Sequence, residues 1–298
     1  MRVALIGAQG QLASDIARHW DSVGLGVSGE LISLSHGDLD VTDAAQVRDV
    51  ISTLRPSIVI NTAAFTQVDD CEQQQGKAML VNADGPRNLA EACREIGARL
   101  VHFSTDYVFD GSKRTPYTES DQPSPINVYG ASKLAGEQIV RDVLPSNHVI
   151  IRTSGLYGSA GMSGHRLNFV EKMIGLAADN KPIRVVNDQV CTPTSTSEVA
   201  RAVLNLLTSE AIGTFHLTSA GQCSWLEFAS EILSIEGVKT ELTPVTSGEF
   251  GAAAKRPAYS VLMSDRLEEM GMSPLPAWER SLREYLEARR PISPVAPG

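Results

Sequence analysis

The first half of the chain alternates short apolar runs with stretches in which apolar residues recur at helical spacing. The apolar runs predict strands over Val3–Ile6, Glu30–Leu34, Ser57–Asn61, Arg99–Ser104 and His148–Arg152. The helical spacing predicts helices over Leu12–Trp20, Ala44–Leu54, Asn82–Ile96 and Tyr129–Val143. Strands that alternate with helices form a parallel sheet covered on both faces, so we expect an α/β fold with a doubly wound parallel sheet.

Beyond Thr153 this alternation weakens. Helical spacing predicts helices over Leu167–Asp179, Ser197–Thr208, Ser224–Ile235 and Pro276–Arg289. Gly155–Gly164 is expected to be a loop, Pro244–Pro257 to be irregular, and the tail Pro291–Gly298 to be frayed. We therefore expect residues 1–154 to form the sheet domain. Residues 155–298 should form mainly a smaller substrate-binding domain, with some segments returning to the first.

Composition narrows the class of protein. The chain has 298 residues, of which 42% are hydrophobic, enough for one large or two medium domains. Its formal net charge of −9 disfavours nucleic-acid binding, since an acidic chain repels phosphate backbones. The sequence contains neither an apolar run of membrane-spanning length nor a signal-peptide pattern. The 4 cysteines and 6 histidines are scattered without metal-binding or disulfide spacing, so we expect a cytoplasmic protein without a preformed metal site.

The first predicted strand runs directly into a glycine-rich turn. Gly7 and Gly10 allow a tight turn and a close approach of the backbone to a pyrophosphate. Gln11 and Leu12 then open a helix whose free N–H groups attract an anion. The alternative is a turn in which the glycines serve only the backbone. The position of the glycine-rich turn between the first predicted strand and the first predicted helix favours a Rossmann-type dinucleotide site.

The second predicted strand ends at Leu34, next to Ser35 and His36. An acidic residue at this place binds the adenosine 2′-hydroxyl and repels a 2′-phosphate. Since Ser35 and His36 carry no fixed negative charge, both NADPH and NADH stay open as cofactors. Asp40 and Val41 follow and are candidates for contacts with the adenine. The alternative is that Ser35 and His36 are only turn residues.

Two residues of the helix predicted over Tyr129–Val143 point to acid–base chemistry. Tyr129 and Lys133 are four residues apart, so their side chains share one helix face. The lysine is expected to lower the pKa of the phenol toward the working range of a proton donor, and to reach the nicotinamide ribose. Such a pair is common on helices by chance. Together with the glycine turn it favours a carbonyl reductase.

Two hydroxyl residues end the predicted strand over Arg99–Ser104. Ser104 and Thr105 fall at its carboxyl end, where ligands bind in open α/β sheets. A hydroxyl there can hydrogen-bond a substrate carbonyl or Tyr129. The alternative is that Ser104 and Thr105 only satisfy backbone groups at the end of the strand.

At these residues the sequence resembles the dTDP-4-dehydrorhamnose reductase family of the extended short-chain dehydrogenase/reductase superfamily. The resemblance extends over nearly the whole chain. Its matching stretches are Gly7–Leu12, Asn61–Thr66, Val68–Asp69 with Glu72, Val81–Ala83, Ser104–Phe109, Asn127–Gly130, Ser132–Glu137, Arg152–Ser154, Asn168–Phe169, Asn187–Gln189, Pro193–Thr194 and Arg256–Pro257.

The resemblance implies reduction of the C4 ketone of dTDP-4-dehydro-L-rhamnose by NADPH or NADH, in the making of rhamnose for cell-wall polysaccharide. Thr105, Tyr129 and Lys133 match the family's catalytic trio. The implied cofactor contacts are Gly7, Gly10, Gln11, Leu12, Ser35, Asp40, Val41, Ala63, Ala64, Phe65 and Asn82, with Tyr129 and Lys133. The implied substrate contacts are Ser104, Thr105, Asp106, Gly155, Asn168 and Arg256. Some family members use Mg²⁺ at a dimer contact, so a homodimer and Mg²⁺ also follow as expectations.

Two features of this chain bear on the substrate. Related dehydratases carry a second carboxylate after the aspartate, whereas Asp106 is followed by Tyr107, which favours simple ketone reduction. The family often has Trp at the position of Gly155, so the sugar wall differs here. A guanidinium fork suits phosphate oxygens, so Arg256 is a candidate for the diphosphate, the alternative being a surface arginine. Two further functions stay open: a reductase or epimerase of another nucleotide-linked 4-keto-6-deoxysugar, and a non-catalytic regulatory subunit like that of methionine adenosyltransferase.

Overall fold

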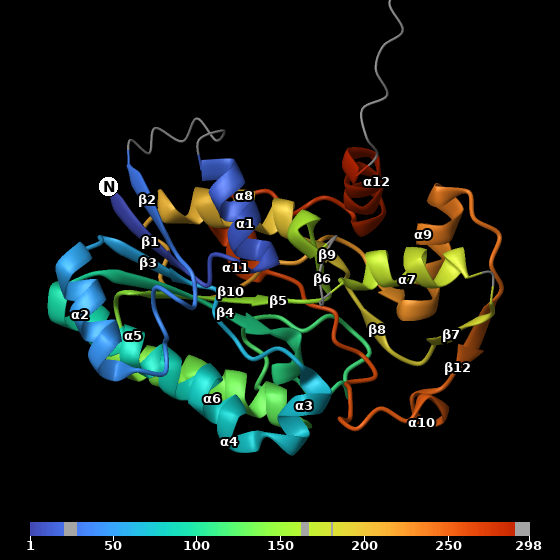
Figure 1. Ribbon diagram of the computed structural model, residues 1–298, viewed down its shortest axis with the longest axis horizontal. Coiled ribbons are helices and arrows are strands. Elements are labelled where there is room, and N and C mark those ends of the chain that lie inside the picture. The colour runs from blue at the N-terminus through green and yellow to red at the C-terminus, as the bar shows by residue number, and fades with distance from the viewer. Residues whose placement is uncertain (21–28, 162–166, 180, 290–298) are drawn as a thin grey trace, which may run out of the picture.

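The protein is built around one six-stranded parallel sheet, seen edge-on in the computed structural model (Figure 1). The structure describes residues 1–20, 29–161, 167–179 and 181–289. The strand order is β10-β5-β4-β3-β1-β2. The strands are β1 (Arg2–Ile6), β2 (Glu30–Leu34), β3 (Ile58–Asn61), β4 (Arg99–Thr105), β5 (His148–Thr153) and β10 (Gly213–His216). The predicted fold class is confirmed, and the five predicted strands agree with β1–β5 to within a residue.

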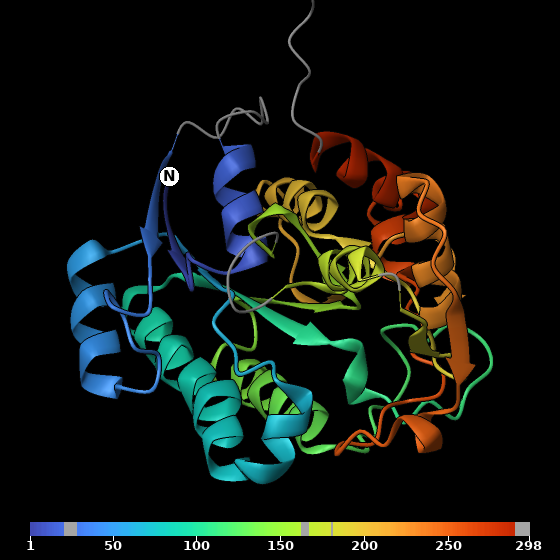
Figure 2. The same ribbon diagram turned by 45° about the vertical axis from the view of Figure 1, so that its right-hand side comes forward.

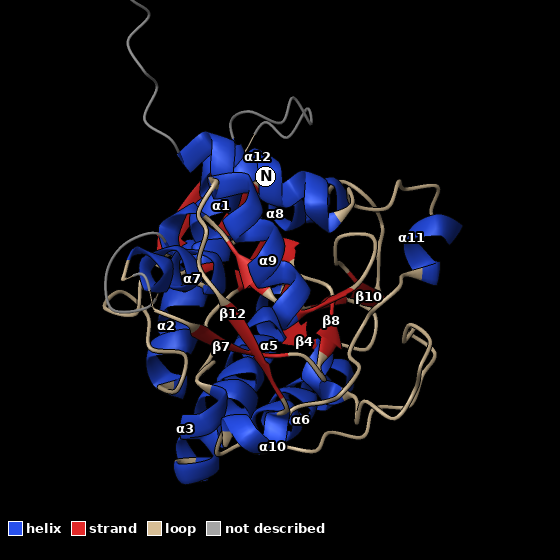
Figure 3. Cartoon of the chain, turned by 90° about the vertical axis from the view of Figure 1, so that its right-hand side faces the viewer, coloured by secondary structure: helices blue, strands red, loops and turns tan. Residues whose placement is uncertain are grey.

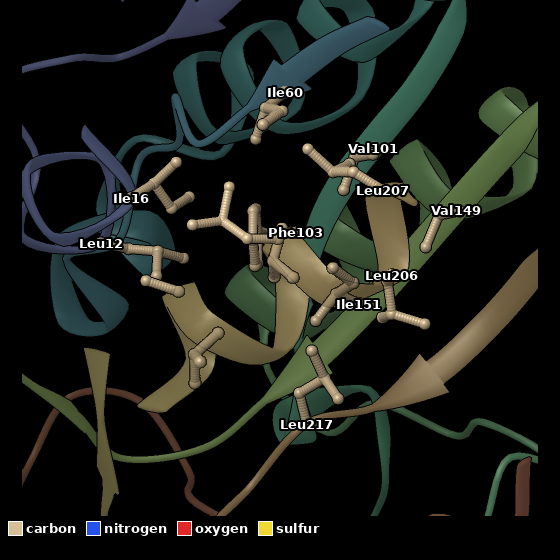
Figure 4. Close-up of a cluster of buried hydrophobic side chains, with 14 of the residues drawn as sticks. Leu12, Ile16, Ile60, Val101, Phe103, Val149, Ile151, Leu206, Leu207 and Leu217 are labelled. Carbon is tan, nitrogen blue, oxygen red and sulfur yellow. The ribbon is translucent and has the colours of Figure 1, made fainter. Parts of the chain in front are cut away.

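Helices cover both faces of this sheet. One face is covered by α1 (Gln11–Trp20) and α8 (Thr196–Leu207), and the other by α2 (Ala44–Leu54), α5 (Gly85–Ile96) and α6 (Val128–Val143). Alternate residues of each strand face opposite layers. Val101 and Phe103 of β4 therefore pack with α1 and α8, in the cluster drawn in Figure 4, whereas Leu100 packs with α2, α5 and α6.

Short helical segments fill the connection between β3 and α5. They are α3 (Val68–Gln73), α4 (Gln75–Met79) and a π-helical turn over Leu80–Asp84. The helix predicted from Asn82 is therefore α-helical only from Gly85. It ends at Gly97, which takes the left-handed conformation (φ 73°) that glycine adopts without steric cost.

Most of the second half folds around a separate apolar cluster and forms what we call the C-terminal lobe. Figure 2 shows its helices and strands beside the carboxyl ends of the sheet strands. Its helices are α7 (Phe169–Ala178), α9 (Trp225–Glu236), α10 (Ser247–Phe250) and α12 (Trp278–Arg289). Its strands are β7 (Ile183–Val186) paired in parallel with β12 (Leu242–Val245), and β8 (Val190–Cys191) paired antiparallel with β11 (Cys223–Ser224). Figure 3 shows β7 and β12 side by side, next to α9.

Several short elements complete the fold. They are β6 (Leu156–Tyr157), β9 (Thr194–Ser195), α11 (Asp265–Glu269) and two 3₁₀ turns over Asp106–Val108 and Ser159–Gly161. The segment 244–257 is not wholly irregular as predicted, because it completes β12 and contains α10. The predicted loop over 155–164 contains β6 and one of the 3₁₀ turns as far as Gly161. Its last residues and the tail after Arg289 lie outside the described residues.

Candidate active site

A cavity of about 840 Å³ lies at the carboxyl ends of the central strands. Strand β2 lies on one side of β1, and β3 lies on the other. The strand order therefore reverses beside β1, and open α/β sheets bind their ligands at such a point. The predicted residues that line this cavity are Gly10, Gln11, Leu12, Ala64, Ser104, Thr105, Asp106, Tyr129, Lys133 and Gly155. The fold therefore brings together three sets of residues from distant parts of the chain.

The glycine turn forms one end of the cavity. Gly7 has a φ of 80°, and a Cβ there would lie 2.9 Å from the backbone nitrogen of Ala63. Helix α1 starts at Gln11 and has no acidic residue in its first turn. Its free N–H groups therefore face the cavity without a competing carboxylate. This cradle fits the pyrophosphate of a dinucleotide.

The end of β2 carries a negative charge that the sequence analysis missed. The Asp38 carboxylate accepts hydrogen bonds from the backbone N–H (2.9 Å) and the hydroxyl (2.6 Å) of Ser35. These bonds hold the pKa of Asp38 below its usual value. Ser35 and His36 themselves carry no fixed negative charge, as expected, but Asp38, three positions after Ser35, folds back and places a carboxylate beside them. The Ser-x-x-Asp spacing was the available signal.

The other residues predicted to bind the cofactor do not line this cavity. Asp40 accepts from the backbone and hydroxyl of Thr42, and Val41 is buried among the helices below the sheet. Asn82 is fully buried. Its side-chain oxygen accepts a hydrogen bond from the Phe65 N–H, and its side-chain nitrogen donates to the Phe65 carbonyl oxygen and to the Ser132 hydroxyl. Asn82 thus fixes the loop after β3 against α6, so its evident task is to position Ala63–Phe65.

Helix α6 carries the two residues predicted to act as acid and base. Its start is held at two points: the Asn127 side chain accepts from the Gly130 N–H (2.7 Å), and Glu72 of α3 accepts from the Val128 N–H (2.9 Å). Tyr129 and Lys133 lie one turn apart, and both side chains line the cavity. Thr105, at the end of β4, lies beside the Tyr129 phenol. The structure therefore brings the predicted trio together.

Burial dominates the electrostatics of this trio. Burial raises the pKa of Tyr129, and the neighbouring Thr105 hydroxyl opposes that rise. The expectation that Lys133 lowers the pKa of the phenol is thus wrong for the protein alone, because the cost of desolvating a phenolate is larger. Burial also lowers the pKa of Lys133 to about 8, against the opposing charge of Glu137. Tyr129 therefore holds its proton at neutral pH.

Asp106 is a buried carboxylate in the wall of the cavity. It accepts hydrogen bonds from the hydroxyls of Thr105 (3.0 Å), Ser154 (2.9 Å) and Ser260 (2.6 Å). Burial raises its pKa to about 6, while the three hydroxyls oppose that rise. Sequence analysis predicted Asp106 as a substrate contact and missed Ser154 and Ser260. The three bonds hold the hydroxyls of Thr105, Ser154 and Ser260 around the carboxylate, and the substrate contact of Asp106 stays a prediction.

A second cavity of about 900 Å³ adjoins the first and lies against the C-terminal lobe. Apolar side chains line much of it, and its rim carries the cationic residues Lys172, Lys181, Arg184, Lys255 and Arg256. Arg256 forms a two-pronged ion pair with Asp69 of α3, at 3.1 Å and 2.7 Å. The predicted diphosphate ligand thus lines a cavity, but its guanidinium already has a carboxylate partner.

Asn168, the remaining predicted substrate contact, lines neither cavity. Its side-chain oxygen accepts from the Glu171 N–H at the start of α7, and its amide donates to the backbone oxygen of Gly158. The Asn-x-x-Glu spacing is typical of a helix N-cap and could have indicated this role.

Comparison with known proteins places this geometry in a family. The family described as RmlD substrate binding domain matches residues 1–290. A dTDP-4-dehydrorhamnose reductase of Clostridium acetobutylicum has a solved structure that is 42% identical, with a TM-score of 0.91 over 97% of this chain and 99% of its own. The chain belongs to the dTDP-4-dehydrorhamnose reductase family. The resemblance read from the sequence is thereby confirmed.

Two further relatives bear on ligands. The dTDP-4-dehydrorhamnose reductase of Bacillus anthracis was solved in complex with NADP and is 39% identical, with a TM-score of 0.90 and coverage of 96% of this chain and 99% of its own. A dTDP-4-keto-6-deoxy-D-glucose reductase of Streptomyces niveus is 39% identical over 95% of this chain and 96% of its own. Members of the family thus differ in the sugar for which they are named.

Two expectations concern ligands and membranes. Within the described residues, no group of three His, Cys, Asp or Glu side chains is placed to hold a metal ion, so the Mg²⁺ implied by the family finds no support there. None of the helices that the structure describes combines the length and apolar character needed to cross a bilayer.

Proposed function

We propose that this protein reduces the C4 ketone of dTDP-4-dehydro-L-rhamnose to dTDP-L-rhamnose with NADPH or NADH. The observation that carries the proposal is the meeting of Thr105, Tyr129 and Lys133 in one cavity that ends at the glycine turn. A proton donor, a cation and a dinucleotide cradle are the parts that a carbonyl reductase needs.

The cofactor has a fitting place along the sheet edge. Gly10, Gln11 and Leu12 would hold its pyrophosphate at the start of α1, and Ser35 and Asp38 would lie near the adenosine ribose. Lys133 would bind the nicotinamide ribose. When bound, the cofactor supplies the hydride that reduces the ketone.

Residues of the chain supply the proton, orient the oxygen that receives it and stabilise the charge that its transfer leaves behind. Tyr129 keeps its proton at neutral pH and donates it to the sugar oxygen at C4 as that oxygen gains negative charge. Thr105 orients the same oxygen, with its own hydroxyl fixed by Asp106. The Lys133 ammonium stabilises the phenolate left behind, in a site where burial makes such charge interactions stronger.

The nucleotide of the substrate would occupy the second cavity. Lys172, Lys181 and Lys255 are exposed at its rim and available to the diphosphate, while the apolar wall, which includes Phe169 and Phe250, suits a pyrimidine base. Arg256 would hold Tyr107 and Asp69 in place, and its positive charge would still attract the phosphates.

A second candidate is the reduction of another nucleotide-linked 4-keto-6-deoxysugar. It is favoured by the relative from Streptomyces niveus, which is named for the D-gluco ketone. A cytoplasmic location, a role in cell-wall polysaccharide synthesis and a homodimer belong to the same proposal.

The test is to incubate the purified protein with NADPH or NADH and enzymatically prepared dTDP-4-dehydro-L-rhamnose. We expect a fall in absorbance at 340 nm and a product with the L-rhamno configuration by NMR. Constant absorbance with this ketosugar and with the D-gluco ketone would overturn the proposal.

A further inference from the structure

The two cavities meet at three shared residues. Tyr107, Gln189 and Trp225 line both of them. If the reacting ketone lies beside Tyr129 in the first cavity and the nucleotide lies in the second, the hexose between them must pass these three side chains. Two aromatic rings and one amide are the groups that proteins use to pack on a sugar ring and hydrogen-bond its hydroxyls.

Trp225 is held firmly at this junction. It is the first residue of α9, directly after Ser224, whose hydroxyl and backbone form a capping box with Glu227. Its ring packs against Phe169, with 4.7 Å between ring centroids, and lies 6.2 Å from Phe228. A ring fixed by packing on one side can present its other edge to a ligand with little loss of side-chain entropy.

The ring of Trp225 stands next to the position where Gly155 lacks a side chain. A Cβ on Gly155 would lie 3.5 Å from Cη2 of Trp225 and 3.1 Å from Cα of Pro193. Gly155 also has a φ of 54°, which strains any other residue. The indole therefore packs directly against the Gly155 backbone, at a position where no larger side chain fits.

Polar groups at the junction are also arranged for a ligand. The Gln189 amide nitrogen donates to the Ser247 hydroxyl (2.8 Å), which directs the amide and leaves its carbonyl oxygen as an acceptor. Trp225 is half-buried, and among the described residues its indole N–H donates no hydrogen bond within the protein. It is available to donate to a sugar hydroxyl.

We propose that Trp225 is the residue that determines which 4-keto-6-deoxyhexose this enzyme accepts, because it forms the cavity wall beside Gly155 at the junction of the two cavities. The inference rests on the proposed function. The indole packs against the hexose and donates to one of its hydroxyls, so a sugar of the other configuration at C3 and C5 loses contact or collides. Tyr107 and Gln189 complete the same subsite.

The test compares the wild type with Trp225→Phe and Trp225→Ala on dTDP-4-dehydro-L-rhamnose and on the matching D-gluco ketone. For Trp225→Ala we expect at least a tenfold rise in KM for the preferred ketone and at least a fivefold fall in the ratio of kcat/KM between the two. Trp225→Phe should give smaller changes in the same direction. The Kd for NADPH, measured by fluorescence titration, should stay within twofold for every variant.

Trp278→Phe is the matched control. Trp278 belongs to the same apolar cluster and contacts Phe228, but it lines neither cavity. It should leave KM and the discrimination ratio unchanged. An unchanged ratio in both Trp225 variants, or an equal change in Trp278→Phe, would overturn the inference. A wild-type protein that reduces neither ketone would instead count against the proposed function.

Discussion

Glu137 and Arg152 form a buried, two-pronged ion pair beneath the active site. The carboxylate accepts from Nε of Arg152 at 2.9 Å and from Nη2 at 2.7 Å, and its side chain is 0% exposed. Burial opposes the charge on Glu137, but Arg152 holds its pKa below the usual value. The pair ties α6, which carries Tyr129 and Lys133, to β5.

Breaking this pair should cost stability. Glu137→Gln leaves the Arg152 guanidinium buried without its counter-charge, which costs about 3 kcal/mol of unfolding free energy. Urea denaturation followed by circular dichroism measures the change. Glu95→Gln is the control, because the pair of Glu95 with Arg48 is exposed and should be worth less than about 1 kcal/mol. Equal midpoints for the two variants would contradict the account.

Tyr129→Phe should remove the proton donor and leave the cavity shape almost unchanged. We expect kcat to fall by roughly 10²–10⁴-fold, the usual contribution of a positioned acid. The Kd for NADPH should stay within about twofold, since the same ring remains in the wall. Tyr117→Phe, which removes a hydroxyl bonded to Asp110 outside both cavities, serves as control. A Tyr129→Phe enzyme with wild-type turnover would remove Tyr129 from the mechanism.

The fall of activity at alkaline pH should follow the deprotonation of the Lys133 ammonium. Burial lowers its pKa to about 8, so the ammonium loses its proton as the pH rises through this value rather than near 10. We expect kcat/KM to begin to fall above about pH 7 and to fall about tenfold per pH unit well above pH 8. In Lys133→Arg any residual activity should not show this fall, because a guanidinium stays charged. A wild-type profile that is flat to pH 10 would show that the charge is not needed.

Asp38 should influence the choice of cofactor. If the adenosine ribose lies at the end of β2, the Asp38 carboxylate beside Ser35 would favour the 2′-hydroxyl of NADH and repel the 2′-phosphate of NADPH. Asp38→Asn should therefore raise the affinity for NADPH relative to NADH by about tenfold, as measured by calorimetric titration. Asp43→Asn, at the N-cap of α2, is a control with the same change of charge. If both variants shift the two affinities alike, Asp38 does not read the ribose.

The sheet could be predicted because its signals are local. Each of β1–β5 is a short apolar run, and each of the helices between them has an apolar face. Strand β10 could not be predicted in this way: Phe215 is its one large apolar residue, and its place beside β5 depends on contacts more than 60 residues apart in sequence. Pairing of this kind is set by the tertiary structure.

The same distinction between local sequence signals and tertiary contacts applies to the active site. Thr105, Tyr129 and Lys133 could be found because strand ends and helix spacing place them together. The polar partners of Asp106, the ion pair of Arg256 with Asp69 and the position of Trp225 next to Gly155 each join segments from distant parts of the chain. The pKa of Tyr129 depends on how deeply the fold buries it, which spacing does not reveal.

The most direct test of the central claim follows one hydrogen atom. The protein is given dTDP-4-dehydro-L-rhamnose and NADPH that carries deuterium at C4 of the nicotinamide, on the face transferred, and the sugar is analysed by NMR. We predict deuterium at C4 of the product in the L-rhamno configuration, and at least a hundredfold slower incorporation with Tyr129→Phe. An unreduced sugar, or deuterium lost to water, would contradict the account.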